Sequence, residues 1–358
     1  GSRTARSIRI VRTARPAWLP GEERNEHTPE GGRRHVTGRQ GERPRQAVAV
    51  RQENQRQTAN RKGHDQRRRA WRGARAELPR LLDIDNLPPS VTLVARPGAC
   101  DVEELLDMSK AEVGKWSPYA VRISGIAPGD VPAVVDGRAA VQDEGSQLVA
   151  LALAHAPIEG SDSQWLDLCA GPGGKAGLLA ALAHARGGSL TAVELQPHRA
   201  DLVRKTLRGV PGAHDVRVAD GRTVTGSFDR VLVDAPCTGL GVLRRRPESR
   251  WRREPGHIGE LTPLQKELLL TAIACTRPGG VIAYVTCSPH LAETELVVDA
   301  VLKAGHVDRL DAREVALTIP GLRNRDEFGA CTEPGPYLRL WPHRHDTDGM
   351  FLALLRRR

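Results

Sequence analysis

The sequence predicts an α/β protein built around a doubly wound, Rossmann-like parallel sheet. From residue 164 onward, short apolar segments typical of strands alternate with segments of helical periodicity, as in a parallel sheet covered by helices. The predicted strands end in a glycine-rich loop or in a carboxylate, at the edge where such sheets bind ligands. Two parts precede this sheet: a basic segment over residues 1–80 and a small α/β subdomain over residues 81–145.

Residues 1–80 differ in composition from the rest of the chain. They contain 21 Lys and Arg against 8 Asp and Glu, with no Phe or Tyr and no periodicity. Such a segment cannot bury enough apolar surface to offset its ordering entropy, so it is predicted to be disordered. The other residues hold 32 basic and 35 acidic side chains, so the net charge of +10 does not indicate that the folded part binds nucleic acid. Two interpretations remain: an RNA-binding arm, or a segment that has no specific role or is not native coding sequence.

The cysteines and the apolar segments indicate the cellular compartment of the protein. No apolar run is long enough to span a membrane, and the start shows no charged-then-apolar signal peptide. No CxxC pair occurs, so neither a zinc site nor a disulfide framework is indicated. These observations predict a soluble protein without a metal, in the reducing cytoplasm. The six widely spaced cysteines are Cys100, Cys169, Cys237, Cys275, Cys287 and Cys331.

The small subdomain over residues 81–145 is too short to enclose a large core and is expected to pack on the domain C-terminal to it. That domain, over residues 146–358, carries the alternating pattern. Pro197 stands at the first turn of a helix, where its missing amide costs little. In the subdomain, strands are predicted at 90–95 and 120–126 and a helix at 102–108. In the domain, helices are predicted at 147–156, 176–185, 197–208, 263–275 and 292–303, parallel strands at 165–168, 190–193, 216–218, 230–233 and 281–285, and a closing antiparallel pair at 337–341 and 350–355.

A glycine-rich loop, Gly171-Pro-Gly-Gly174, directly follows the first strand of the parallel sheet. Glycines let backbone amides approach a ligand closely, and Glu194 at the end of the next strand suits the hydroxyls of a ribose. Asp220, one strand further, is placed to accept a hydrogen bond from an adenine amino group. The loop lacks the glycine spacing of NAD sites and of ATP phosphate sites. S-adenosylmethionine, a nucleoside without a phosphate, therefore fits better than NAD or ATP; the alternative is a plain glycine-rich turn.

Two cysteines also follow strand ends. Cys237 closes the motif Asp234-Ala-Pro-Cys and, read alone, is the candidate nucleophile, whereas Cys287 lies in Thr-Cys-Ser. The segments WLDLCAGPGGKA, FDRVLVDAPCTGLGVLRRRPESRW, AYVTCS and TDGMFLALL closely resemble the Sun/Fmu family of RNA 5-methylcytosine methyltransferases, over about residues 85–358. Within that family, the bacterial enzymes of the 16S ribosomal RNA are the most similar. The resemblance implies a class I methyltransferase that uses S-adenosylmethionine.

Methylation at carbon 5 of cytosine explains the two cysteines. That carbon is a poor nucleophile, but a thiolate that adds to carbon 6 converts the ring into an enamine that can attack a sulfonium methyl. The resemblance implies that Cys287 is this nucleophile, that Cys237 serves in product release, and that Asp234 contacts the cytosine. The alternative for Cys287 is a buried apolar residue. The resemblance further implies that the cofactor is bound by Cys169, Ala170, Gly171, Pro172, Gly173, Gly174, Lys175, Glu194, Asp220 and Asp234.

A basic loop follows the Cys237 motif. Its arginines would contact phosphates, and Trp251 would stack on a strand whose target base is flipped out; the alternative is a solvated charged surface. The resemblance favours 16S ribosomal RNA as the substrate, with transfer RNA as one alternative and an RNA-binding protein that has lost catalysis as another. No membrane or metal partner is expected, and a monomer is favoured. The predicted RNA contacts are Arg244, Arg245, Arg246 and Trp251.

The chain departs from the family at three points. Gly171 replaces a common Ala, which is harmless because glycine tolerates any backbone angle. Ala176 replaces the usual Thr and removes a hydroxyl, so it is expected to weaken cofactor binding modestly. Residues 1–80 do not resemble the helical RNA-binding domain, similar to the antitermination factor NusB, that such members carry. This last departure affects substrate delivery rather than chemistry.

Overall fold

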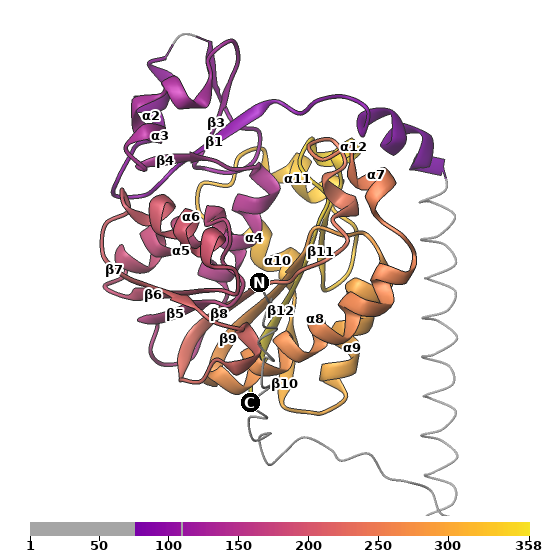
Figure 1. Cartoon of the computed structure of the whole chain (residues 1–358). Helices are drawn as coiled ribbons and strands as arrows, with labels where there is room; N and C mark the ends of the chain where they lie inside the picture. The colour runs from indigo at the N-terminus through magenta and orange to yellow at the C-terminus, as the bar shows by residue number, and fades with distance from the viewer. Residues whose placement is uncertain (1–75, 109) are drawn as a thin grey trace, which may run out of the picture. The chain divides into compact units, whose positions relative to one another are not determined.

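The computed structural model of the protein describes residues 76–108 and 110–358 (Figure 1). Residues 76–84 are helical, so the disorder predicted for the N-terminal segment is wrong for its last five residues. The rest of that segment, with its two interpretations, lies outside the described residues. The helix is anchored by Glu77, whose carboxylate accepts hydrogen bonds from Arg344 at 2.7 and 2.8 Å. The two partners lie 267 residues apart in the chain, so local composition cannot predict this contact.

A small antiparallel sheet with the strand order β2-β3-β1-β4 forms the first part of the described chain. Its core contains the buried side chains of Leu93, Leu105 and Val121. The two predicted strands are present, whereas β2 and β4 were not predicted because three residues are too few to show an alternating pattern. The elements are β1 Val91–Ala95, α2 Val102–Leu106, β2 Ala111–Val113, β3 Ala120–Ile123, η1 Pro128–Asp130, α3 Pro132–Val135 and β4 Ala139–Val141.

The larger sheet has the order β10-β12-β9-β8-β5-β6-β7, and β11 pairs with β12. The strands from β9 to β7 are parallel, whereas β12 runs antiparallel to both β9 and β10. The chain winds outward from β5 in both directions, which confirms the predicted doubly wound class and places the topological switch point, where such sheets bind ligands, between β5 and β8. The strands are β5 Gln164–Asp167, β6 Ser189–Glu194, β7 Ala213–Val218, β8 Phe228–Asp234, β9 Thr276–Thr286, β10 Val307–Leu310, β11 Leu338–Leu340 and β12 Met350–Arg357.

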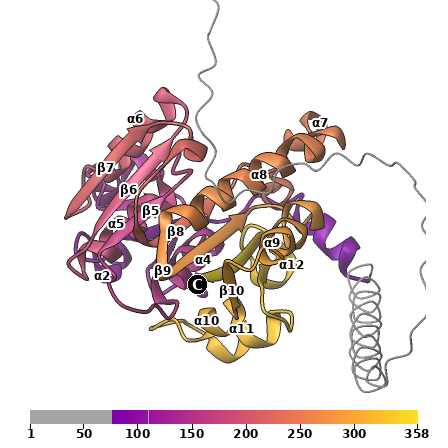
Figure 2. The same cartoon turned by 90° about the horizontal axis from the view of Figure 1, so that it is seen from below.

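Helices cover both faces of this sheet with separate hydrophobic clusters. On one face α4, α5, α6 and α10 bury side chains such as Leu151 and Leu179, and on the other α8 and α9 bury Leu269 and Val298. Figure 2 shows α8 running along one side of β8 and β9. In the described part of the chain, no helix is long and apolar enough to cross a membrane. The helices are α4 Glu144–His155, α5 Gly174–His184, α6 Pro197–Leu207, η2 Gly221–Thr223, η3 Leu240–Val242, α7 Ser249–Arg252, α8 Gly256–Cys275, η4 Leu291–Glu293, α9 Glu295–Leu302, α10 Ala312–Leu317, α11 Arg325–Cys331 and α12 Pro342–His345.

Helix α8 begins before the predicted start at Pro263, which lies inside the helix. The prediction assumed that a proline marks a first turn. Here the proline is exposed on the helix surface. Helix α8 also contacts the Cys237 segment, because the buried Gln265 donates from Nε2 to the backbone oxygen of Pro236 at 2.9 Å.

Candidate active site

The two cysteine motifs meet at the carboxyl ends of neighbouring parallel strands. Asp234 on β8 is in register with Val285 on β9, so the segments that follow them lie side by side. The amide of Gly241, on the Cys237 side, donates to the backbone oxygen of Cys287 at 2.8 Å. The sulfur atoms of Cys237 and Cys287 are 3.4 Å apart. The structure thus brings together two thiols that lie 50 residues apart in the sequence.

The two thiols have different electrostatic surroundings. The hydrogen bond with Cys237 lowers the pKa of Cys287 against the opposing effect of burial, and the Lys175 ammonium also lowers it. The same hydrogen bond raises the pKa of Cys237 well above its usual range, and burial and the Glu293 carboxylate act in the same direction. The carboxylates of Asp234 and Asp348 act to raise the pKa of Cys287, but the net effect lowers it, so Cys287 is the more readily ionised thiol of the pair.

Lys175 and Asp234 form an ion pair beside these thiols. The Lys175 Nζ lies 2.8 Å from the Asp234 Oδ2, and the two side chains are 12% and 30% exposed. Burial acts to lower the pKa of Lys175, but Asp234 outweighs it and the pKa is raised. The ammonium is therefore charged at neutral pH, and it links the glycine-rich loop to the cysteine site.

The predicted cofactor residues lie along one edge of the sheet, at the ends of β5, β6, β7 and β8. After the glycine loop, α5 begins at Gly174, and Gly173 before it has a φ of +113°. A Cβ atom at Gly173 would lie 2.9 Å from Thr206, so both the backbone angle and the space require glycine. Glu194 is buried, and its carboxylate accepts from the amides of Gly171 at 3.1 Å and Gln196 at 2.9 Å. A close backbone approach beside a buried carboxylate fits the ribose of S-adenosylmethionine.

Two further carboxylates and one thiol belong to this edge. Asp220 is engaged by Arg222, whose hydrogen bonds lower the pKa of Asp220. The predicted adenine contact stays a prediction and requires Arg222 to share this carboxylate. Asp167, not predicted as a site residue, is buried with an unpartnered Oδ2, and burial raises its pKa to about 7. Burial raises the pKa of Cys169 well above its usual range, and its assignment to the cofactor loop stays a prediction.

Two of the four predicted RNA contacts, Arg244 and Arg245, form ion pairs within the protein. The Arg244 side chain is 5% exposed and forms an ion pair with Asp346. Arg245 forms ion pairs with Asp348 at 2.9 Å and with Asp143 at 3.1 Å. These carboxylates lie about a hundred residues away along the chain, so the sequence motif could not show that they neutralise the two arginines.

Arg246 and Trp251 remain available at the surface, and the Trp251 side chain is 79% exposed. Arg252 and Arg253 are exposed beside it. The predicted RNA contacts at Arg246 and Trp251 stay predictions. Among residues 76–108 and 110–358, no group of three or more His, Cys, Asp or Glu side chains is placed to hold a metal ion.

The glycine loop and the carboxylates at successive strand ends define a class I methyltransferase that uses S-adenosylmethionine. Two adjacent thiols lie at the same edge of the sheet. The chain belongs to the family described as 16S rRNA methyltransferase RsmB/F, whose sequence profile matches residues 152–356. This confirms the family resemblance seen in the sequence.

Individual relatives agree with this assignment. A Mycobacterium tuberculosis protein described only as a candidate methyltransferase is 53% identical over 283 residues, covering 78% of this chain and 60% of that protein. The Homo sapiens 28S rRNA (cytosine(4447)-C(5))-methyltransferase is 32% identical over 295 residues, covering 78% of this chain and 36% of that protein. The structure of NSun6 from Pyrococcus horikoshii shares the fold, with a TM-score of 0.66 at 19% identity, covering 79% of this chain and 94% of that one. The chain spans about 60% of the length of the first curated relatives that it matches.

Proposed function

We propose that the protein transfers a methyl group from S-adenosylmethionine to carbon 5 of a cytosine in RNA, through a covalent adduct with Cys287. The substrate that the family favours is 16S ribosomal RNA. The observation that carries the proposal is the pair of thiols 3.4 Å apart, of which Cys287 is the one placed to be a thiolate. A single structural cysteine would need neither the second thiol nor the nearby ammonium of Lys175.

The residues divide the reaction between them. S-adenosylmethionine supplies an electrophilic methyl group. The Cys287 sulfur forms a bond to carbon 6 of cytosine, and the electron pair of the 5,6 double bond moves to carbon 5, which takes the methyl group. Asp234, held by Lys175 at 2.8 Å, hydrogen-bonds the ring and stabilises the adduct. A base then takes the proton from carbon 5, the electron pair of that bond re-forms the 5,6 double bond, and the Cys287 sulfur leaves as a thiolate. Cys237, whose sulfur lies 3.4 Å away, is close enough to donate a proton to this thiolate.

RNA binding is assigned to the exposed part of the basic loop. Trp251 supplies a stacking surface, and Arg246 with Arg252 and Arg253 supplies charge for phosphates. Residues 1–80 stay a candidate arm, a cytoplasmic location and a monomer stay predictions, and no metal is needed for this chemistry.

The deciding experiment offers labelled S-adenosylmethionine with 16S RNA, small ribosomal subunits and transfer RNA, and maps the product. Carbon-5 methylation of 16S RNA supports the proposal, whereas preference for transfer RNA would select the alternative substrate. Cofactor binding without transfer to any RNA would favour a protein that binds RNA but has lost catalysis.

The two cysteine roles are separable by substitution. Cys287→Ala is expected to abolish both transfer and the covalent adduct, because no thiolate remains to attack carbon 6. Cys237→Ala is expected to accumulate a protein–RNA adduct that survives denaturation, since release is impaired. Denaturing gel electrophoresis with labelled RNA distinguishes them, and the opposite pattern would reverse the two roles.

A further inference from the structure

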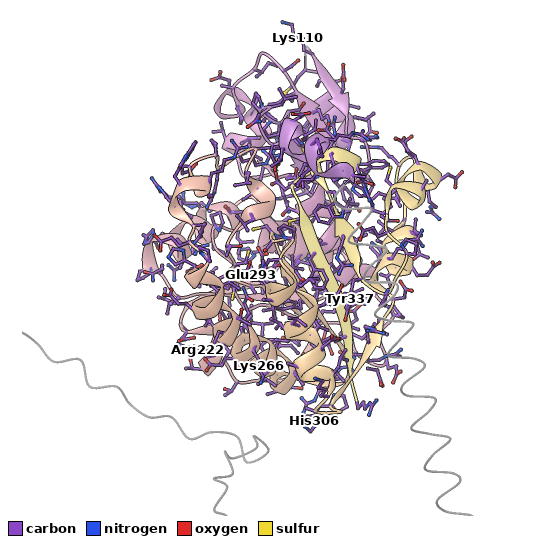
Figure 3. All side chains as sticks on the ribbon, turned by 90° about the vertical axis from the view of Figure 1, so that its right-hand side faces the viewer. Lys110, Arg222, Lys266, Glu293, His306 and Tyr337 are labelled. Carbon is purple, nitrogen blue, oxygen red and sulfur yellow. The ribbon has the colours of Figure 1, made fainter. Side chains whose placement is uncertain are left out.

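Glu293 is a buried carboxylate that no sequence motif singled out. It ends η4, between the Cys287 loop and α9, and its exposure is 0% (Figure 3). Four donors converge on it. Oε1 accepts from Thr238 N at 2.8 Å and Gln265 Nε2 at 3.1 Å, and Oε2 accepts from Thr238 Oγ1 at 2.5 Å and Ser288 Oγ at 2.6 Å. Two donors on each oxygen fill the hydrogen-bonding capacity of an ionised carboxylate.

The donors belong to the residues that flank the two thiols. Thr238 directly follows Cys237, and Ser288 directly follows Cys287. Their hydroxyl oxygens also lie 3.3 Å from each other. Gln265 donates a second bond, to the backbone oxygen of the residue before Cys237, at 2.9 Å. One carboxylate therefore connects both cysteine loops to helix α8.

The charges around the thiols are arranged asymmetrically. Cys237 faces the Glu293 carboxylate and also interacts with the hydroxyl of Tyr284. Cys287 faces the Lys175 ammonium, with Asp234 and Asp348 as opposing carboxylates. The Glu293 carboxylate disfavours ionisation of Cys237, whereas at Cys287 the Lys175 ammonium favours ionisation against the two carboxylates, and the hydrogen bond from Cys237 is the largest effect that favours it. Removing the carboxylate of Glu293 would remove both the hydrogen bonds that hold the two cysteine loops and the negative charge beside Cys237.

We propose that Glu293 is a positioning residue, which holds the two thiols at reacting distance and keeps the shared proton on Cys237, so that Cys287 carries the negative charge. Glu293 does not touch the reacting atoms. Its consequence for catalysis rests on the proposed function, but the state of the thiols can be measured without RNA.

The test is alkylation of the folded full-length chain with iodoacetamide between pH 6 and pH 10, with each cysteine followed by mass spectrometry. In the wild type, Cys287 is expected to react at least about tenfold faster than Cys237 at neutral pH, because only thiolates displace iodide. In Glu293→Gln this preference is expected to fall by about tenfold. Glu295→Gln is the matched control, because it removes a carboxylate two residues away that pairs with Arg339. The control is expected to keep the wild-type preference.

Further variants separate the effect of the Glu293 charge from the effect of its hydrogen-bond geometry. Circular dichroism shows whether each variant is folded. Glu293→Asp keeps the charge but shortens the reach, so the preference for Cys287 should persist while the kcat for methyl transfer falls and the KM for S-adenosylmethionine stays constant. If Glu293→Gln does not fold, the double variant Thr238→Val with Ser288→Ala removes two of the four donors and should lower kcat in the same way.

The inference is overturned if folded Glu293→Gln reacts like Glu295→Gln, or if the double variant keeps the wild-type kcat. A wild type that methylates no RNA, but whose thiol preference is lost in Glu293→Gln, would refute the proposed function and leave the role of Glu293 standing. A wild type that methylates RNA, but whose two thiols react at equal rates with iodoacetamide, would refute the role of Glu293 and leave the proposed function standing.

Discussion

Replacing Lys175 by Met removes the cation that links the cofactor loop to the thiols. Its Nζ lies 2.8 Å from Asp234, and the two side chains are 12% and 30% exposed. Leaving a half-buried carboxylate without its partner is expected to cost about 2 kcal/mol of unfolding free energy, less than a fully buried pair because Asp234 reaches water.

The larger effect falls on Cys287, whose pKa is lowered by the hydrogen bond with Cys237 and by the Lys175 charge. Removing one cation near a thiolate is expected to raise the thiol pKa by about one unit, which corresponds to about 1.4 kcal/mol and to tenfold in the thiolate fraction. Without Lys175 the pKa of Cys287 rises, so transfer is expected to slow about tenfold at neutral pH and to recover as the pH increases.

The assay is single-turnover methyl transfer from pH 6 to pH 10, with S-adenosylmethionine saturating for each variant. Lys175→Arg keeps the positive charge, so its transfer rate should rise with pH over nearly the same range as that of the wild type. Lys266→Met is the control for a lost cation, since Lys266 is exposed on α8 (Figure 3). If Lys175→Met loses the same factor at every pH, the lysine acts on cofactor binding or orientation and the electrostatic reasoning is refuted.

Three further changes test other parts of the site. Gly173→Ala places a Cβ atom on a backbone with φ of +113°, 2.9 Å from a neighbouring side chain, which costs about 1–2 kcal/mol of strain. The affinity for S-adenosylmethionine, measured by calorimetry, is therefore expected to fall at least about tenfold. Unchanged affinity would contradict the assignment of this loop to cofactor binding. Arg245→Gln leaves two buried carboxylates without their cation and is expected to lower the free energy of unfolding in urea by about 3 kcal/mol. Arg246→Gln, at an exposed position, should leave stability unchanged and weaken RNA binding in filter assays. Equal effects of the two variants on stability would contradict the different environments assigned to the two arginines. His345 is buried, and burial lowers its pKa from 6.5 to about 4. Between these values the unfolded chain binds a proton that the folded chain does not, so stability is full above pH 6.5 and is lost as the pH falls. His345→Gln is expected to remove about 2 kcal/mol of that loss between pH 7 and pH 4, and an unchanged pH slope in the variant would contradict it.

The sheet and the positions of the motifs could be predicted because each depends on short stretches of chain. A buried parallel strand is a continuous apolar run, and the residue that ends it lies at the ligand-binding edge whatever its neighbours are. Glu194, Asp220 and Asp234 all lie at such strand ends in the structure. The short strands of the small sheet and the true start of α8 escaped prediction, because three residues show no period and an interior proline imitates a helix start.

The ion pairs of the basic loop show the limit of the local argument. Arg244, Arg245 and Arg246 are consecutive and chemically identical, yet the first two meet carboxylates of the C-terminal segment and only the third is exposed. Which arginine is available to RNA depends on the direction that each side chain takes from the folded loop. A charge count along the sequence contains no such information.

The sequence by itself determined the fold class, the family, the cofactor loop and the presence of two cysteines at strand ends, because these depend on local pattern and motif. Only the tertiary structure decided which groups lie beside the two thiols, and that one buried carboxylate accepts hydrogen bonds from the residues that follow both of them. That decision depends on Lys175, Glu293 and the pairing of β8 with β9, which bring together groups 50 or more residues apart. Electrostatic effects fall with distance in space, not with distance along the chain, so they exist only once the protein has folded.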